Sequence, residues 1–110
     1  MPYSKEAVIF IEAPIFSRVV YDYLSEDDYA ALQWALILKP DTGDAIPGSG
    51  GLRKMRWGGS GKGKRGGNRI IYYRQTAQGE IWLLTIYSKS ETENIPAHIL
   101  RKIAEEIQNV

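Results

Sequence analysis

A stretch rich in proline and glycine, residues 39–51 ("KPDTGDAIPGSGG"), divides the sequence into two parts with different patterns. Proline lacks a backbone donor and glycine favours turns, so helical structure must end there. Helical spacing dominates before this stretch, and three strand-like segments follow it. A chain of 110 residues supports one small core, so we expect a single α+β domain spanning residues 1–110.

The first part predicts one strand and two helices. Residues 8–12 are the expected strand, because residues 8–11 are β-branched or aromatic, and Pro14 can start a helix in its first turn. Residues 16–24 carry apolar side chains at the spacing of an amphipathic helix. Ser25 is the expected N-cap of the second helix, with Asp28 completing a capping box. Its expected buried residues are Tyr29, Leu32, Leu36 and Ile37.

The second part predicts a small sheet and a final helix. Residues 52–57, 68–74 and 80–88 are the expected strands, and "TAQG" at 76–79 should join the last two as an antiparallel hairpin. Isoleucines recur every four residues from Ile95 to Ile107, which predicts a helix that covers a sheet face or serves a partner. The order β-α-α-β-β-β-α predicts a small curved, mainly antiparallel sheet with helices on one side.

The composition excludes several classes of catalytic and metal site. The absence of cysteine excludes disulfides and thiolate metal sites, and the single histidine, His98, excludes a histidine triad or a multi-histidine zinc site. We therefore expect no metal and no cofactor. No apolar run approaches the length of a membrane span or a signal-peptide core, so we expect a cytoplasmic protein without membrane contact.

Positive charge is concentrated in one segment. Eight of the fourteen Lys and Arg residues lie within residues 45–79, which contain no acid, although the net charge of the chain is only +1. Such a segment attracts phosphates. Strand alternation places Lys54 and Arg56 opposite Met55 and Trp57, the expected core contacts. On the next strand, alternation does not show which face meets the core. We expect Arg69 to join Lys54 and Arg56 in a phosphate site.

The glycine-rich loop adds three further cations, Lys62, Lys64 and Arg65, as candidate phosphate contacts. "GKGKRG" matches a dinucleotide fingerprint, but it precedes a strand instead of opening a helix. "GGSGKGK" lacks the Ser or Thr of a phosphate-binding loop, because Arg65 stands there. Aromatic residues between the cations instead favour nucleic acid, since rings stack on unpaired bases. We expect Trp34 and Trp82 in the core and Tyr87 to be accessible.

Three blocks, "PGSGGLRKMRW", "GKGKRGGNRIIYY" and "WLLTIYSK", resemble the HigB-like branch of the RelE/ParE superfamily of bacterial toxin-antitoxin toxins. The resemblance covers nearly the whole chain. It implies a microbial RNase-like fold and a ribosome-dependent endoribonuclease, an mRNA interferase that cleaves mRNA in the A site without metal. The implied products are a 2′,3′-cyclic phosphate and a 5′-hydroxyl. It also implies a cognate helix-turn-helix, HigA-like antitoxin, with the ribosome and mRNA as further partners and a monomeric toxin when alone.

By position, the resemblance assigns the catalytic basic residues to Lys54, Arg56 and Arg69. Surrounding cations disfavour the charged form of Lys54, which makes it the candidate general base. The tail departs from the family, with Lys89 and Ser90 where Arg and then Tyr are frequent. Candidate replacements are Tyr87 for stacking or proton transfer and Lys89 as a cation, while Arg53 is a further candidate RNA contact.

Three alternatives remain open from the sequence. The first is a ParE-like inhibitor of DNA gyrase that cleaves nothing, although retention of the basic residues argues against it. The second is an RNA-binding module without catalysis. The third is an orphaned toxin that has lost its active tail.

Overall fold

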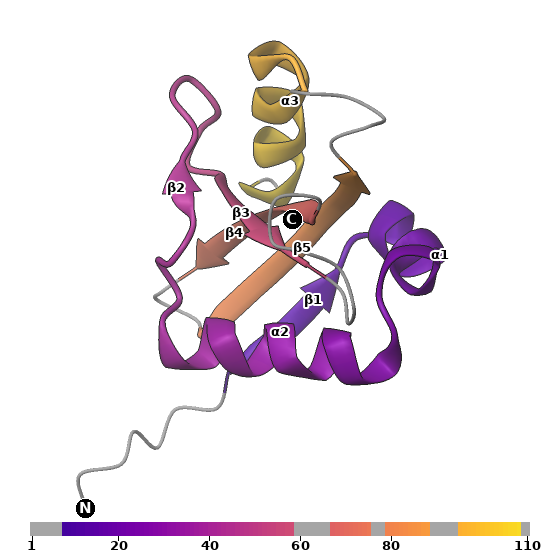
Figure 1. Cartoon of the computed structure of the whole chain (residues 1–110). Coiled ribbons are helices and arrows are strands. Elements are labelled where there is room, and N and C mark those ends of the chain that lie inside the picture. The colour runs from indigo at the N-terminus through magenta and orange to yellow at the C-terminus, as the bar shows by residue number, and fades with distance from the viewer. Residues whose placement is uncertain (1–7, 59–66, 76–78, 89–94, 109–110) are drawn as a thin grey trace, which may run out of the picture.

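The computed structural model describes residues 8–58, 67–75, 79–88 and 95–108. Its elements follow the expected order, with one additional short strand inside the proline- and glycine-rich stretch (Figure 1). They are β1 (Ile9–Glu12), α1 (Pro14–Tyr23), α2 (Glu26–Leu38), β2 (Asp44–Ala45), β3 (Arg53–Trp57), β4 (Asn68–Gln75), β5 (Glu80–Ser88) and α3 (Ala97–Gln108). Within the described part of the chain, no helix is long and apolar enough to cross a membrane.

The strands form one mixed sheet in the order β1-β5-β4-β3-β2. β1 runs parallel to β5, and the other neighbours are antiparallel, which confirms the mainly antiparallel sheet. The additional strand β2 pairs Asp44 with Lys54 and Ala45 with Arg53. Its two residues lie between Gly43 and Pro47, so only the pairing with β3 makes them a strand.

Local signals set the helix starts as expected. Pro14 occupies the first turn of α1. At α2 the Ser25 hydroxyl accepts a hydrogen bond from the Asp28 backbone N–H at 3.0 Å, and the Ser25 N–H donates to the Asp28 carboxylate at 3.4 Å. This capping box satisfies donors that a helix otherwise leaves unpaired. Glu26, Asp27 and Asp28 also place negative charge at the positive end of the helix.

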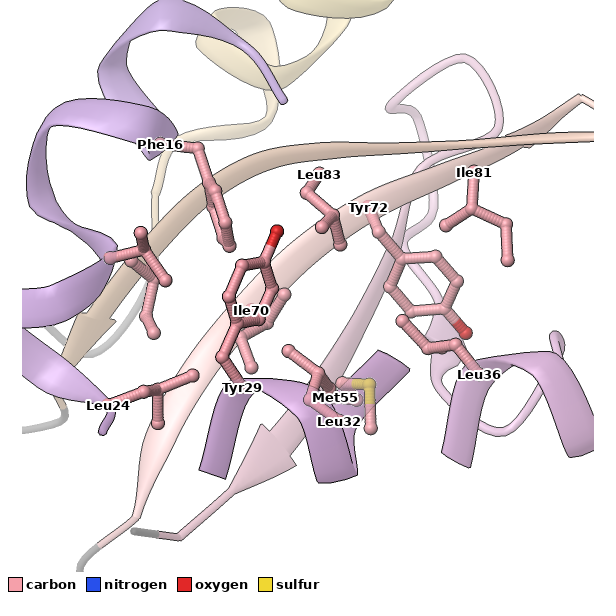
Figure 2. Packing of buried hydrophobic residues seen from close by; sticks show 12 residues of the cluster. Phe16, Leu24, Tyr29, Leu32, Leu36, Met55, Ile70, Tyr72, Ile81 and Leu83 are labelled. Atoms are coloured by element: carbon pink, nitrogen blue, oxygen red, sulfur yellow. The ribbon is translucent and has the colours of Figure 1, made fainter. Parts of the chain in front are cut away.

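The larger core lies between one face of the sheet and the helices α1 and α2. Figure 2 shows its side chains pointing toward one another from both helices and the sheet. The side chain of Trp57 is partly buried against this core, and its indole N–H donates to the Asp28 carbonyl at 3.1 Å. The core residues are Phe16, Val20, Leu24, Tyr29, Leu32, Leu36, Met55, Ile70, Tyr72, Ile81, Leu83 and Ile86.

A second core lies on the opposite face, under α3, so the expectation of helices on one side was wrong. Figure 1 shows α3 and α2 on opposite sides of the sheet. The second core comprises Leu52, Ile71, Leu84, Tyr87, Leu100 and Ala104. The reason is visible in β4, where the neighbours Ile70 and Ile71 point to opposite faces and both are buried. Both faces of the central strands are apolar, so both need a cover.

The accessibility of several aromatic and apolar residues also differs from expectation. Trp34 is 63% exposed and Tyr87 only 6% exposed, the reverse of what we expected. Ile37 is exposed, whereas Tyr29, Leu32 and Leu36 are buried as expected, and Trp82 is half-buried. α2 is apolar on more than one side, so sequence periodicity could not identify the side that meets the sheet. Tyr87 is buried because α3 folds back over β5.

Gly43 is required by a close approach of the chain to β3 and β4. Its backbone N–H donates to the Tyr72 hydroxyl at 3.0 Å, and this hydroxyl donates to the Pro40 carbonyl at 2.7 Å. A Cβ at this position would lie 2.9 Å from the Lys54 carbonyl oxygen and 2.9 Å from a Tyr72 ring carbon. These bonds and contacts hold the stretch before β2 against the sheet.

We therefore expect Gly43→Ala to lower the free energy of unfolding by about 1–3 kcal/mol, because the added methyl group forces backbone or ring to shift. Urea denaturation measures this change in the free energy of unfolding. The control is Thr42→Ala at the exposed neighbouring position, with an expected change below about 0.5 kcal/mol. A Gly43→Ala protein as stable as the wild type would contradict the close approach.

Candidate functional site

Arg56, Arg69 and Tyr87 form a row across three adjacent strands. Arg56 on β3 pairs with Arg69 at the start of β4, and Arg69 pairs with Tyr87 near the end of β5. Side chains directly opposite on paired strands share a face, with Cβ atoms about 5 Å apart. Residues that are separated by more than ten positions in the chain therefore become immediate neighbours. We refer to these three residues as the arginine row.

Lys54 lies on the same face, two residues before Arg56 on β3. It pairs with Ile71 on one side and with Asp44 of β2 on the other, and it is half-buried. Leu52 and Ile71 on this face belong to the core under α3. The structure thus places Arg69 on the face of Lys54 and Arg56, as expected from the sequence. Both faces of β4 meet a core, which resolves the ambiguity that alternation left.

Arg69 is a buried cation held by backbone. Its side chain is 7% exposed, and its Nη1 donates to the Gly67 carbonyl at 2.9 Å. Among the described residues no carboxylate forms an ion pair with it, and the residue opposite it is another arginine. A buried charge without a counter-charge costs free energy, and like charges directly opposite each other repel. The site therefore favours binding of an anion.

Tyr87 contributes an unsatisfied donor to the same site. Its hydroxyl is buried and has no hydrogen-bond partner among the described residues. Burial raises the pKa of Tyr87 above its ordinary value of 10.0, and the nearby Arg69 charge offsets part of that rise. The hydroxyl is therefore protonated at neutral pH and can donate a hydrogen bond. Buried polar groups without a partner are rare and costly, so a ligand oxygen is a natural acceptor.

α3 and the loop before β3 frame the site. Leu100 and Ala104 of α3 pack in the same core as Tyr87, next to the arginine row. The Arg101 side chain anchors the helix by donating from Nε to the Gly48 carbonyl at 2.9 Å. Gly48, Gly50 and Gly51 have positive φ angles, so the loop bends in a way that glycine permits. The result is a face covered by α3 beside a row whose Arg56 side chain is exposed.

The remaining sequence candidates lie elsewhere. Arg53 points to the opposite face, where its Nη1 donates to the carbonyls of Gly43 at 2.6 Å and Asp41 at 3.4 Å. Its guanidinium therefore ties the stretch before β2 to β3. Lys62, Lys64, Arg65 and Lys89 lie outside the described residues. His98 is exposed on α3, and the described residues contain no group of three His, Cys, Asp or Glu side chains placed to hold a metal ion.

Sequence reasoning did not single out Gly67, whose carbonyl orients Arg69. Nothing distinguishes this glycine from its neighbours in a glycine-rich run, because its role depends on where the Arg69 side chain turns back. The sequence also left the alignment of Arg69 with Tyr87 undetermined, because a bulge between Ile71 and Tyr72 shifts the register of β4 and β5. A bulge of this kind has no clear signature in the sequence.

The fold and the arginine row define a class of small α+β domain, in which a mixed sheet carries helices on both faces and clusters cations on the face under its last helix. No family model matches the chain. Among solved structures, the chain is similar to the E. coli toxin RelE, in a double arginine-to-alanine variant in the free state. The TM-score is 0.52 at 13% sequence identity, covering 79% of this chain and 88% of that one. The chain therefore has a RelE-like fold.

Proposed function

We propose that this chain is the toxin of a type II toxin-antitoxin system, of the HigB-like type, that stops translation by cutting mRNA on the ribosome. The observation that carries the proposal is the arginine row, which joins a buried arginine that has no described counter-ion to a buried tyrosine hydroxyl that has no described partner. A phosphodiester supplies both the negative charge and the acceptor oxygens that these groups need. The RelE-like fold supports the same assignment.

The proposed reaction uses the RNA's own 2′-hydroxyl as nucleophile. The 2′-oxygen forms a bond to phosphorus while the bond from phosphorus to the 5′-oxygen breaks, which leaves a 2′,3′-cyclic phosphate. Lys54 is the proposed acceptor of the 2′-hydroxyl proton, and the departing 5′-oxygen takes a proton from water to give a 5′-hydroxyl. No metal or cofactor takes part in the proposed reaction.

In this mechanism the arginine row stabilises charge rather than transferring protons. Arg56 and Arg69 bind the non-bridging oxygens, whose negative charge grows in the transition state. Tyr87 donates a hydrogen bond to the same phosphate. Because strands hold these groups rigidly, they are preorganised for a geometry that the substrate must adopt. Dependence on the ribosome follows, since the ribosome would hold the mRNA with its 2′-oxygen in line with the leaving group.

The test is in-vitro translation of a defined message with the purified protein, followed by primer extension. We expect new 5′ ends within the coding region when ribosomes occupy the message, and none on the same mRNA without ribosomes. The matched control is Arg56→Ala, because Arg56 is exposed and its loss should spare the fold. We expect it to reduce cutting strongly.

Other outcomes would overturn the proposal in distinct ways. Intact mRNA together with inhibition of DNA gyrase supercoiling would support the ParE-like alternative. Association with mRNA on ribosomes at unchanged message length would support an RNA-binding module. In cells, the proposal requires that protein synthesis stop before DNA synthesis when the toxin is expressed without its helix-turn-helix antitoxin.

A further inference from the structure

The outward side of α2 carries an exposed apolar stripe. Trp34 is 63% exposed and Leu38 is 78% exposed, and Ile37 beside them is also exposed. Ala30 and Ala31, one turn before Trp34, are exposed small residues. Positions three, four, seven and eight apart lie on one side of a helix, so these five residues form a continuous surface. We refer to them as the outer stripe.

The outer stripe is unusual because α2 already buries its other side. Tyr29, Leu32 and Leu36 of the same helix are part of the core under the sheet. A helix that is apolar all round is normally covered on all sides, and an exposed tryptophan is typical of the centre of a protein interface. The outer stripe therefore has the composition of a contact surface.

The charges at the two ends of α2 favour a second copy of this chain as the partner that covers the outer stripe. Glu26 and Asp27 are exposed in the first turn, and Lys39 is exposed at the other end as the C-cap. If a second α2 packs antiparallel across the outer stripe, the acidic turn of each copy faces the lysine of the other. The two helix dipoles also oppose each other favourably in this orientation. A parallel arrangement would bring like charges together at both ends.

The sizes of the side chains are complementary in the same arrangement. In an antiparallel pair centred near residue 33, Trp34 of each copy faces Ala31 of the other, so a large side chain meets a small one. A two-fold interface requires this reciprocity, in which residue i contacts residue j and residue j contacts residue i. We propose that the protein forms a two-fold symmetric homodimer through antiparallel packing of the outer stripes, in place of the monomer expected from the family resemblance.

Dimerisation in this way leaves the candidate functional site open. α2 covers the sheet face that bears Met55 and Ile70, whereas Arg56 and Arg69 lie on the opposite face, the face on which α3 packs. The proposal therefore does not depend on the proposed function. Because each copy contributes a single helix, the contact is small and we expect a dissociation constant of about 1–100 μM.

Sedimentation equilibrium of the whole chain, from about 1 to 300 μM, tests the dimer. We expect the mass to rise from one chain to two, and Trp34→Glu to weaken association by at least about 30-fold, as expected for loss of a central aromatic anchor. Ile15→Glu is the matched control, because Ile15 is an exposed isoleucine on α1 outside the outer stripe. A wild-type protein that stays monomeric, or equal effects of the two variants, would overturn the proposal.

A charge exchange tests the antiparallel orientation and does not depend on Trp34. At low salt, Glu26→Lys and Lys39→Glu should each weaken the dimer by about 3-fold to 10-fold, since Lys39 faces Glu26 in this register and each change affects two symmetric ion pairs. The double variant Glu26→Lys/Lys39→Glu should regain most of the wild-type affinity. Failure of the double variant to recover would rule out the proposed orientation. Circular dichroism confirms that each variant is folded.

Discussion

Arg69→Met is expected to abolish most of the cleavage activity and, at the same time, to stabilise the protein. Cleavage on programmed ribosomes at saturating toxin should fall by about 10²-fold or more, the scale seen when one preorganised contact to developing charge is removed. The midpoint of thermal unfolding should rise by about 5 °C, corresponding to about 1 kcal/mol. The two effects have one cause. The Arg69 guanidinium is buried without a counter-ion among the described residues, and the phosphate of the RNA would supply one.

The stability gain follows from what Arg69 experiences in the free protein. It is buried on β4 directly opposite Arg56, so methionine removes both a desolvated charge and a repulsive cross-strand pair while filling similar space. The loss of its bond to the Gly67 carbonyl offsets part of the gain. Residues that serve binding at the expense of stability are common at functional sites.

Arg74→Met is the control for net charge. Arg74 lies on the same strand and is exposed, so its removal changes the charge by the same amount without relieving burial. We expect its unfolding midpoint to change by less than about 2 °C and its cleavage rate to remain near that of the wild type. If Arg69→Met cuts at the wild-type rate, or if it unfolds at a lower temperature, the account of the arginine row is wrong.

Tyr87→Phe is expected to lower single-turnover cleavage by about 10²-fold and to raise the free energy of unfolding by about 1 kcal/mol. The variant keeps the ring in its core and removes only a buried hydroxyl that has no described partner. Because burial raises the Tyr87 pKa above 10.0, the hydroxyl is protonated throughout the neutral range. The loss should therefore be the same at about pH 6 and about pH 9, as for a hydrogen-bond donor.

Tyr72→Phe is the matched control, because it removes the same atom from a tyrosine whose hydroxyl is hydrogen-bonded. The Tyr72 hydroxyl bridges the Gly43 N–H and the Pro40 carbonyl on the other face of the sheet. We expect this variant to lose about 1–3 kcal/mol of stability and to keep its cleavage rate per folded molecule. A Tyr87→Phe loss that shrinks at high pH would instead indicate proton transfer by Tyr87 and contradict the assignment as a donor.

Local sequence rules determined much of the fold. The Ser25 and Asp28 capping box, Pro14 in the first turn of α1 and the order of helices and strands follow from interactions within a few residues, so they could be predicted from the chain alone. Alternation also separated Lys54 and Arg56 from Met55 and Trp57. The concentration of basic residues in one segment pointed to the candidate site as well, because charge density along the chain is a property of the sequence itself.

Tertiary structure decided how these elements meet. Only the packing of α3 on the second face shows why Ile70 and Ile71 are both buried and why Tyr87 is covered, while α2 leaves Trp34 exposed. Only strand register places Arg69 between Arg56 and Tyr87, and only the pairing with β3 makes a strand of Asp44–Ala45. Capping and alternation act within one element and are encoded locally, whereas register and helix docking depend on contacts between distant residues, which sum over the whole sheet.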